Sequence, residues 1–354
     1  MSGSGAPRFP LFLAGTAVLL AAGLHPAFGC AACGCCLSTD GAMGFTTAPG
    51  WRLVLQMDYI DQDQLRFGTG GISTAQVAAL NTPAPGLGQE VEHRTLTRTT
   101  TLGLLFAPDP DWSFRLMVPY LDRYHATYGG ASDPVTPDQL STARVMGLGD
   151  AKVMAGYSGF GSDHALTLQV GLKLPTGDYG GQAMNGGPVV GRNPVAFGPS
   201  GNSGGMLLDT SLQAGTGSTD LLLGLLYHRA VSLDFRAYLS AQFQGAFAQK
   251  LDAAGSDYRP GNQESLTLGV RYEASQAWVP QCQVNLTHKC ADQGALADTL
   301  DSSGTVAYLS PGLIGRLAPG LQAFAFAQVP VYSNLSGYQL FPHWTGTLGL
   351  AYRF

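Results

Sequence analysis

Eleven residues at the end of the chain alternate between two kinds of side chain, and this alternation restricts the possible folds more than any other feature. One face carries Trp344, Gly346, Leu348, Leu350, Tyr352 and Phe354, and the other carries Thr345, Thr347, Gly349, Ala351 and Arg353. A period of two residues is that of a β-strand. Because one face suits lipid and the other suits a wet interior, the segment predicts a strand of a transmembrane β-barrel.

The same alternation recurs along most of the chain. Further segments with apolar residues at alternate positions begin at Trp51, Leu166, Phe235 and Leu266. Polar and charged side chains occupy the opposite positions, and burying them unpaired in a dry sandwich core would be costly. We therefore expect an all-β chain forming one antiparallel barrel. Its selectivity would come from inward charges that line the pore, namely Arg52, Asp58, Lys173, Arg236, Arg271 and Arg353.

The composition agrees with a membrane barrel. Charged residues make up 12% of the chain, which is about half the average of soluble proteins. The net charge of −5 gives no reason to expect nucleic acid as a partner. No apolar run after residue 29 is long enough for a membrane helix. An exported chain of this kind is either a secreted β-protein or a barrel in the outer-membrane lipid.

The first 29 residues predict a cleaved signal peptide. Arg8 precedes the apolar run Phe9–Ala22, and the small residues Ala27 and Gly29 fit a cleavage site. The run is shorter than the roughly 20 residues that a membrane helix requires. We therefore expect a signal peptide at 1–29, a periplasmic cysteine-rich segment at 30–50 and the barrel at 51–354.

The connections between the predicted strands alternate in length. Short turns are expected at 107–111, 159–163, 230–233, 274–277 and 318–320, and longer connections at 61–91, 128–146, 175–218, 249–263, 289–303 and 333–343. Outer-membrane barrels have short periplasmic turns and longer outer loops. The pattern predicts twelve strands with both termini in the periplasm, and fourteen strands is the alternative.

Two of the outer connections have more specific features. The connection 175–218 is long enough to fold inward as a constriction. It contains the strand-like segment 206–214, which we assign to the loop because counting it as a strand breaks the alternation. The segment 74–80 predicts a short helix.

The segment between the signal peptide and the first strand carries a cluster of thiols. Four cysteines fall within seven residues, namely Cys30, Cys33, Cys35 and Cys36. Such a set can surround a soft metal ion, Cu(I) or Zn(II). Disulfide formation in an oxidising compartment is an alternative, and so is lipid attachment at Cys30.

The remaining cysteines lie in a single predicted strand and its loop. Cys282 has the parity of Trp278 and should point toward lipid, and a direct bond to Cys290 would require the chain to fold back. His288 and Cys290 sharing a site is a minor alternative. Nothing in the pattern places a serine beside a histidine, so we expect no enzymatic activity.

Several motifs resemble those of a known family. They are Gly147-Leu-Gly-Asp150, Gly171-Leu-Lys-Leu-Pro-Thr-Gly177, Gly215-Thr-Gly-Ser-Thr-Asp220, Ser310-Pro-Gly-Leu313 and Gly349-Leu-Ala-Tyr-Arg-Phe354. Over roughly residues 90–354 the chain resembles outer-membrane transporters grouped with proteins encoded beside the meta-cleavage pathway of phenol degradation. The resemblance implies a single barrel that passes small solutes passively. Resemblance to such barrels also implies that the outer-membrane assembly machinery recognises the terminal aromatic residue. The cysteine cluster is not a general feature of the group.

Two functions follow as hypotheses. The first is an outer-membrane channel for small solutes or ions. The second is a barrel that anchors the cysteine segment, which would hand copper to a periplasmic metal protein or dock a redox protein; sheathing an electron carrier is a variant of it.

Overall fold

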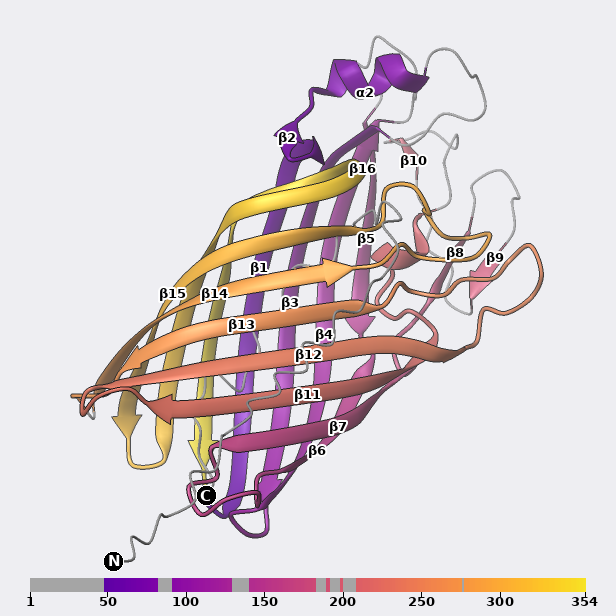
Figure 1. Cartoon of the computed structure of the whole chain (residues 1–354). Coiled ribbons are helices and arrows are strands. Elements are labelled where there is room, and N and C mark those ends of the chain that lie inside the picture. The colour runs from indigo at the N-terminus through magenta and orange to yellow at the C-terminus, as the bar shows by residue number, and fades with distance from the viewer. Residues whose placement is uncertain are drawn as a thin grey trace, which may run out of the picture.

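The computed structural model describes residues 48–81, 91–128, 140–182, 189–191, 198–199, 208–275 and 277–354. Within these ranges the chain forms a tall, tilted barrel of antiparallel strands (Figure 1). The predicted signal peptide and the cysteines of the 30–50 segment lie outside the described residues.

The wall is built from long strands that follow one another around the barrel. They are β1 (Gly50–Gly68), β3 (Val91–Ala107), β4 (Trp112–Tyr128), β5 (Leu140–Leu148), β6 (Ala151–Tyr157), β7 (Leu166–Leu174), β11 (Ser218–Ala230), β12 (Phe235–Gln249), β13 (Gln263–Tyr272), β14 (Trp278–Lys289), β15 (Gly304–Ala318) and β16 (Leu321–Arg353). Short strands outside this ring are β2 (Gly70–Gly71), β8 (Gly180–Gln182), β9 (Val189–Gly191) and β10 (Gly198–Pro199).

Eleven of these strands close the ring, in the order β4, β3, β1, β16, β15, β14, β13, β12, β11, β7, β6 and back to β4. β16 pairs with β15 over its first half and with β1 over its second half, and Leu335 has partners on both. β4 pairs with β5 and β6 in turn, so these two are halves of one pass. The chain therefore runs along the height of the wall twelve times, which confirms the predicted barrel.

One predicted connection is wrong, and the connections predicted at 61–91 and 128–146 are shorter than predicted, because β1 continues to Gly68 and β5 begins at Leu140. The sequence predicted a long outer connection at 333–343, but β16 continues through these residues and reverses near Gly337. Gly337 has a φ of +46°, a left-handed conformation that glycine adopts at little cost. The tight reversal allows both halves of β16 to extend further than the apolar alternation indicates.

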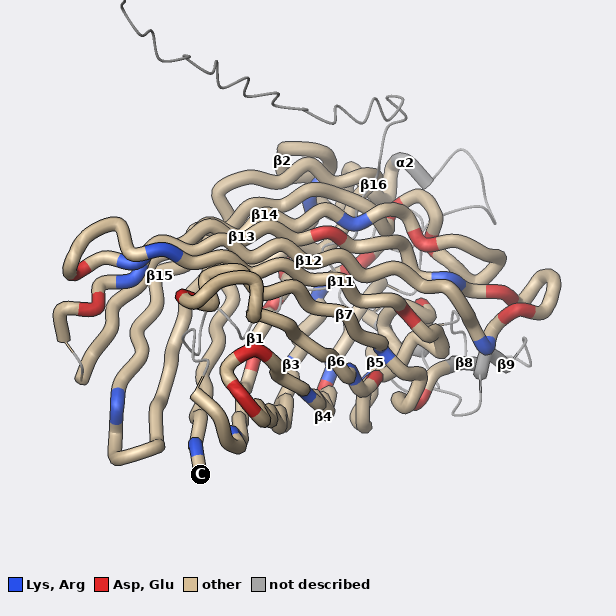
Figure 2. The backbone as a smooth tube through the Cα atoms, turned by 60° about the horizontal axis from the view of Figure 1, so that its bottom comes forward, with Lys and Arg blue, Asp and Glu red and all other residues tan. Residues whose placement is uncertain are grey.

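The alternation of the sequence sets the two faces of the wall. On β1 the outward Leu55 is 48% exposed, whereas the inward Asp58 is 4% exposed. Apolar residues outside and polar residues inside are the reverse of the arrangement in a soluble protein. They suit a wall whose outer face contacts lipid in place of water. Figure 2 shows charged residues as scattered positions on a wall that is mostly uncharged. Aromatic pairs stack on the outer face, with Trp51 on Phe106 near one end and Tyr59 on Trp344 further along.

Part of the barrel interior is an apolar core. Val54, Ile314, Phe324, Phe326 and Ala351 are buried together on the inner side of β1, β15 and β16. Two glycines on neighbouring strands make room for the rings. A Cβ atom added at Gly349 would lie 2.1 Å from the ring of Phe324, and one added at Gly312 would lie 2.3 Å from that of Phe326.

The predicted helix is present as α2 (Thr74–Asn81). Ser73 begins it with a capping box, since its Oγ accepts from the Gln76 N–H and Gln76 Oε1 accepts from the Ser73 N–H. Val77 packs with Val91 and Tyr338, so α2 lies over one end of the barrel (Figure 1). Among the described residues no helix is both long and apolar enough to cross a membrane.

Candidate functional site

A short stretch of the 175–218 connection lies inside the barrel. Leu208 and Leu212 are buried against Ala143 and Val145 of β5, and a 3-10 helix, η2 (Thr210–Leu212), forms there. The β4–β5 register places Ala143 and Val145 on the inner face, opposite His125 and Arg123. The prediction that this connection folds inward is confirmed for these residues. We call Leu208–Gln213 the constriction segment.

Polar contacts hold the constriction segment on two sides. Arg123 of β4 donates from Nη1 to the carbonyl oxygens of Ser211, at 3.2 Å, and Gln213, at 3.5 Å. On the other side, Thr210 Oγ1 donates to the carbonyl of Leu296, at 3.3 Å, in the loop between β14 and β15. The segment therefore bridges two parts of the barrel end. Its own carbonyls accept from Arg123 and its Thr210 hydroxyl donates to Leu296, so moving the segment would break these bonds.

A buried ionic cluster anchors the chain on either side of this connection. Lys173 Nζ lies 3.0 Å from Asp150 Oδ2, 3.2 Å from Asp220 Oδ2 and 2.9 Å from Ser218 Oγ, and it also donates to Thr216 Oγ1. These five residues form the Lys173 cluster. One ammonium faces two carboxylates, all almost fully buried. A buried charge is tolerated only when it is paired in this way.

Asp150 links the cluster to two turns. Its carboxylate accepts the backbone N–H of Gly177, at 3.1 Å, and that of Thr216, at 3.0 Å. The two turns and the β5–β6 break approach closely through glycines. A Cβ atom at Gly177 would lie 2.8 Å from the carbonyl carbon of Gly149 and 2.9 Å from the Cα of Gly215. Three of the motifs that carry the family resemblance therefore meet at one point.

The six residues predicted to line the pore do not gather in one place. Lys173 belongs to the cluster above. Asp58 accepts from Gln56 Nε2 and from Thr347 Oγ1, at 2.7 Å. Arg236 and Arg271 both contact the carboxylate of Glu273, with Nε–O distances of 3.0 Å for Arg236 and 3.6 Å for Arg271. Arg52 is buried opposite Arg353, which is exposed at the end of β16. Their role in selectivity stays a prediction.

Sequence reasoning missed three residues of the site. Arg123, Asp150 and Asp220 were not among the predicted site residues, yet they hold the constriction segment and the Lys173 cluster together. The inward parity of Arg123 on β4 was a usable signal. Asp150 and Asp220 each end a motif that carries the family resemblance, but nothing in the sequence placed the two motifs together.

The loop between β14 and β15 carries a perturbed carboxyl. Asp301 sits against the β16 reversal, where its Oδ1 accepts the backbone N–H of Tyr338 at 3.2 Å. Burial, together with the nearby Asp298, raises the pKa of Asp301 to about 8. Asp301 is therefore mostly protonated at neutral pH.

This shift predicts a pH dependence. Because the folded pKa of Asp301, about 8, exceeds the ordinary 3.8, the folded protein holds a proton that the unfolded chain releases. Its stabilising contribution is complete below pH 3.8 and is lost as pH rises to about 8. We expect the unfolding temperature in detergent to fall between pH 6 and pH 9, and to fall less in Asp301→Asn. Equal slopes for the two proteins would contradict the assignment.

The two described cysteines are both free. Cys282 is exposed on the outer face, as its parity predicted. Cys290 Sγ lies 4.0 Å from His288 Nε2, and His288 Nδ1 is 2.9 Å from Thr305 Oγ1. The pKa of the Cys290 thiol is raised by burial and by Glu264, which disfavours a reactive thiolate.

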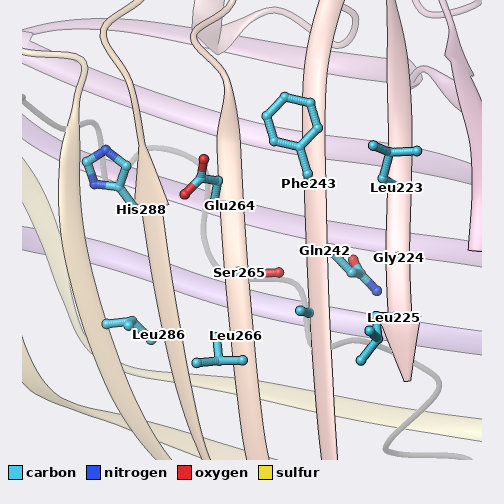
Figure 3. A pocket seen from close by; sticks show the side chains of 11 residues that line it. Leu223, Gly224, Leu225, Gln242, Phe243, Glu264, Ser265, Leu266, Leu286 and His288 are labelled. Atoms are coloured by element: carbon cyan, nitrogen blue, oxygen red, sulfur yellow. The ribbon is translucent and has the colours of Figure 1, made fainter. Parts of the chain in front are cut away.

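His288 also borders an apolar groove on β11–β14, shown in Figure 3. Glu264 and His288 are directly opposite each other at one end, and Leu225, Leu266 and Leu286 lie at the other. The register places this groove on the outer face, beside exposed Leu223 and Leu286. It is therefore not part of the barrel interior.

The predicted metal site lies outside the described residues. Cys30, Cys33, Cys35 and Cys36, with Cu(I) or Zn(II) as the proposed ion, stay a prediction that metal analysis of the mature N-terminus would test. Within the described part of the chain, no group of three or more His, Cys, Asp or Glu side chains is arranged to hold a metal ion.

Comparison with solved structures identifies the fold at low sequence identity. An outer-membrane channel from Pseudomonas putida F1 aligns with a TM-score of 0.60 at 12% identity, over 88% of this chain and 97% of the other. The chain has the fold of an outer-membrane β-barrel. The translocator domain of an autotransporter from Neisseria meningitidis aligns with a TM-score of 0.48 at 11% identity, over 89% of this chain and 92% of the other. No family model matches the sequence, and no curated protein matches it.

Proposed function

We propose that the protein is a channel of the bacterial outer membrane that passes small solutes passively and performs no covalent chemistry. The observation that carries this proposal is the constriction segment, which lies within the barrel and is held by hydrogen bonds from the wall and from a loop. A segment that partly fills a barrel and rests on breakable bonds suits a regulated passage. The similar barrel from Pseudomonas putida F1 is described as an outer-membrane channel, which supports the proposal.

The interior suggests a class of solute. One side is the apolar core around Phe324 and Phe326. Beside it runs a polar row, in which Asn285 donates to Ser310 Oγ, at 2.8 Å, and to Gln328 Oε1, at 3.0 Å. These side chains are almost fully buried against one another, so a solute would meet them only after the interior rearranges. An interior with both kinds of side chain fits a small molecule with an apolar body and a polar group. A phenolic compound belongs to this class.

We also propose that both termini lie on the periplasmic side. The two termini of the barrel meet, since the Trp51 N–H donates to the Phe354 carbonyl at 3.2 Å. The short turns after β3, β11, β13 and β15 are at this end, and the longer connections are at the other, together with the one tight reversal described there, at Gly337. Periplasmic turns are the short ones in bacterial barrels.

Flux through liposomes tests the proposal. Phenylalanine and glutamine share the same zwitterionic backbone, cross lipid poorly and differ in side-chain polarity. We expect the reconstituted protein to admit phenylalanine faster than glutamine. The variant Phe324→Gln with Phe326→Gln should remove most of this preference, because it replaces the apolar surface without emptying it.

The control is a variant on the outer face, Phe243→Gln, which should leave the preference unchanged. Reconstituted protein that passes neither amino acid, and carries no ion current in planar bilayers, would overturn the channel proposal.

A further inference from the structure

A group of charged side chains lies on the outer face of the barrel, across β3, β4 and β5. Arg144 contacts Asp122 with two nitrogens, Nε to Oδ1 at 2.9 Å and Nη2 to Oδ2 at 3.0 Å. Arg98 Nη1 lies 3.4 Å from the same carboxylate. The register pairs Arg98 with Asp122, next to Tyr124 and Arg144 on the following strand pair. We call Arg98, Asp122 and Arg144 the arginine clamp.

The clamp lies at the boundary of the apolar band. Arg98 is directly opposite Tyr59, whose ring stacks on Trp344 with centroids 5.6 Å apart. On one side of this level the outward residues of β1, β3 and β5 are apolar and exposed, namely Met57, Leu102, Met146 and Leu148. Aromatic residues mark the interface between hydrocarbon and headgroups in membrane barrels. The clamp is therefore at headgroup depth, on the side away from the chain termini.

The clamp has a surplus of positive charge. Two guanidinium groups share one carboxylate, which leaves a net charge of +1. Their side chains are 45% and 55% exposed. No residue that the structure describes accepts from Arg98 Nε or Nη2, or from Arg144 Nη1. The neighbouring pair differs, because Arg94 and Asp61 balance one to one through two bonds of 2.8 and 2.6 Å.

We propose that the arginine clamp binds a phosphate group of the outer-leaflet lipid, the phosphorylated glucosamine lipid known as lipid A. A guanidinium offers a planar pair of donors that matches phosphate oxygens. An exposed cation at headgroup depth beside an apolar surface meets both the phosphate and the acyl chains of such a lipid. The location rests on the proposed outer-membrane orientation, but the binding can be measured apart from any channel activity.

The test is native mass spectrometry of the full mature chain in detergent, with purified bisphosphorylated lipid A and its dephosphorylated form as probes. Wild-type protein should retain the phosphorylated lipid preferentially. Arg98→Gln with Arg144→Gln should weaken this binding by about tenfold or more, as expected for the loss of charge-assisted hydrogen bonds. The Lys double variant should keep part of the affinity, because the charge remains. Asp122→Asn should strengthen binding, because it removes the competing carboxylate.

Two controls make the result specific. Arg229→Gln removes an exposed arginine at the opposite end of the wall and should leave lipid binding unchanged. Heat-modifiable mobility in gels verifies that each variant is folded. Equal binding by wild type and the Gln double variant would overturn the proposal. Equal retention of both lipids by wild type would also overturn it, since acyl chains alone would then account for the contact. Neither outcome depends on whether the barrel conducts.

Discussion

Replacing Lys173 with methionine should destabilise the folded barrel and increase its conductance. The change leaves Asp150 and Asp220 buried without their cation. Breaking a buried pair by removing one partner costs roughly 3–5 kcal/mol. Since Asp150 also accepts the N–H groups of Gly177 and Thr216, the turns on either side of the constriction segment should loosen with it.

Two measurements check this expectation, the unfolding temperature in detergent and single-channel current in planar bilayers. The control is Lys152→Met. Lys152 is the direct cross-strand partner of Lys173, but its ammonium donates to the neutral Gln244, at 3.2 Å. Its loss should therefore matter less. Adding Asp150→Asn and Asp220→Asn to Lys173→Met should recover part of the stability. If Lys173→Met and Lys152→Met have the same stability and conductance, the Lys173 cluster does not hold the constriction segment in place.

Replacing Arg123 with methionine should raise conductance by a different route. The guanidinium supplies donors to the Ser211 and Gln213 carbonyls, and its Nε donates to Thr97 Oγ1 at 3.0 Å. Methionine fills similar space and offers no donor. The constriction segment would then leave unsatisfied carbonyls inside the barrel, which costs about 1–3 kcal/mol for each group. Water could satisfy these groups if the segment moved away from the wall.

The matched control is Arg115→Met. Arg115 lies on the same strand and the same inner face as Arg123, nearer the end that holds the chain termini. We expect larger and more frequent openings for Arg123→Met and nearly unchanged current for Arg115→Met. An identical current trace for Arg123→Met and wild type would show that the segment does not restrict passage.

The sequence predicted the barrel well because lipid and interior impose opposite requirements on adjacent residues. In each segment the alternation of apolar and polar residues distinguishes the lipid-facing side from the interior side. The strand that begins near Trp51 and the strand that ends at Phe354 could therefore be recognised separately. Their antiparallel pairing then followed from the count of passes, and the register joins Arg52 to Arg353. The reversal at Gly337 was not predicted, because Tyr338 to His343 contains a proline and reads as a loop. The strand nevertheless continues there.

The site was harder to predict, because it depends on contacts between distant segments. Lys173 was correctly placed on the inner face, but its partners come from a strand break and from the start of another strand. The segment 206–214 was assigned to the loop, and the path of its described residues is fixed by distant partners, namely Arg123, the Leu296 carbonyl, and Ala143 and Val145 of β5. The periodicity of so short an apolar run does not distinguish a strand of the wall from a loop segment that folds into the interior.

The seam between the first and last strands has a consequence for how the molecule forms. Trp51 and Phe354 exchange backbone hydrogen bonds of 3.2 and 3.0 Å across nearly the whole length of the chain. Contacts between residues so far apart in sequence form late and slowly. Until the final segment has been synthesised, the free edge of β1 has no partner and is open to pairing with other chains. The edge of β1 must therefore be protected during biogenesis until residues 344–354 pair with it.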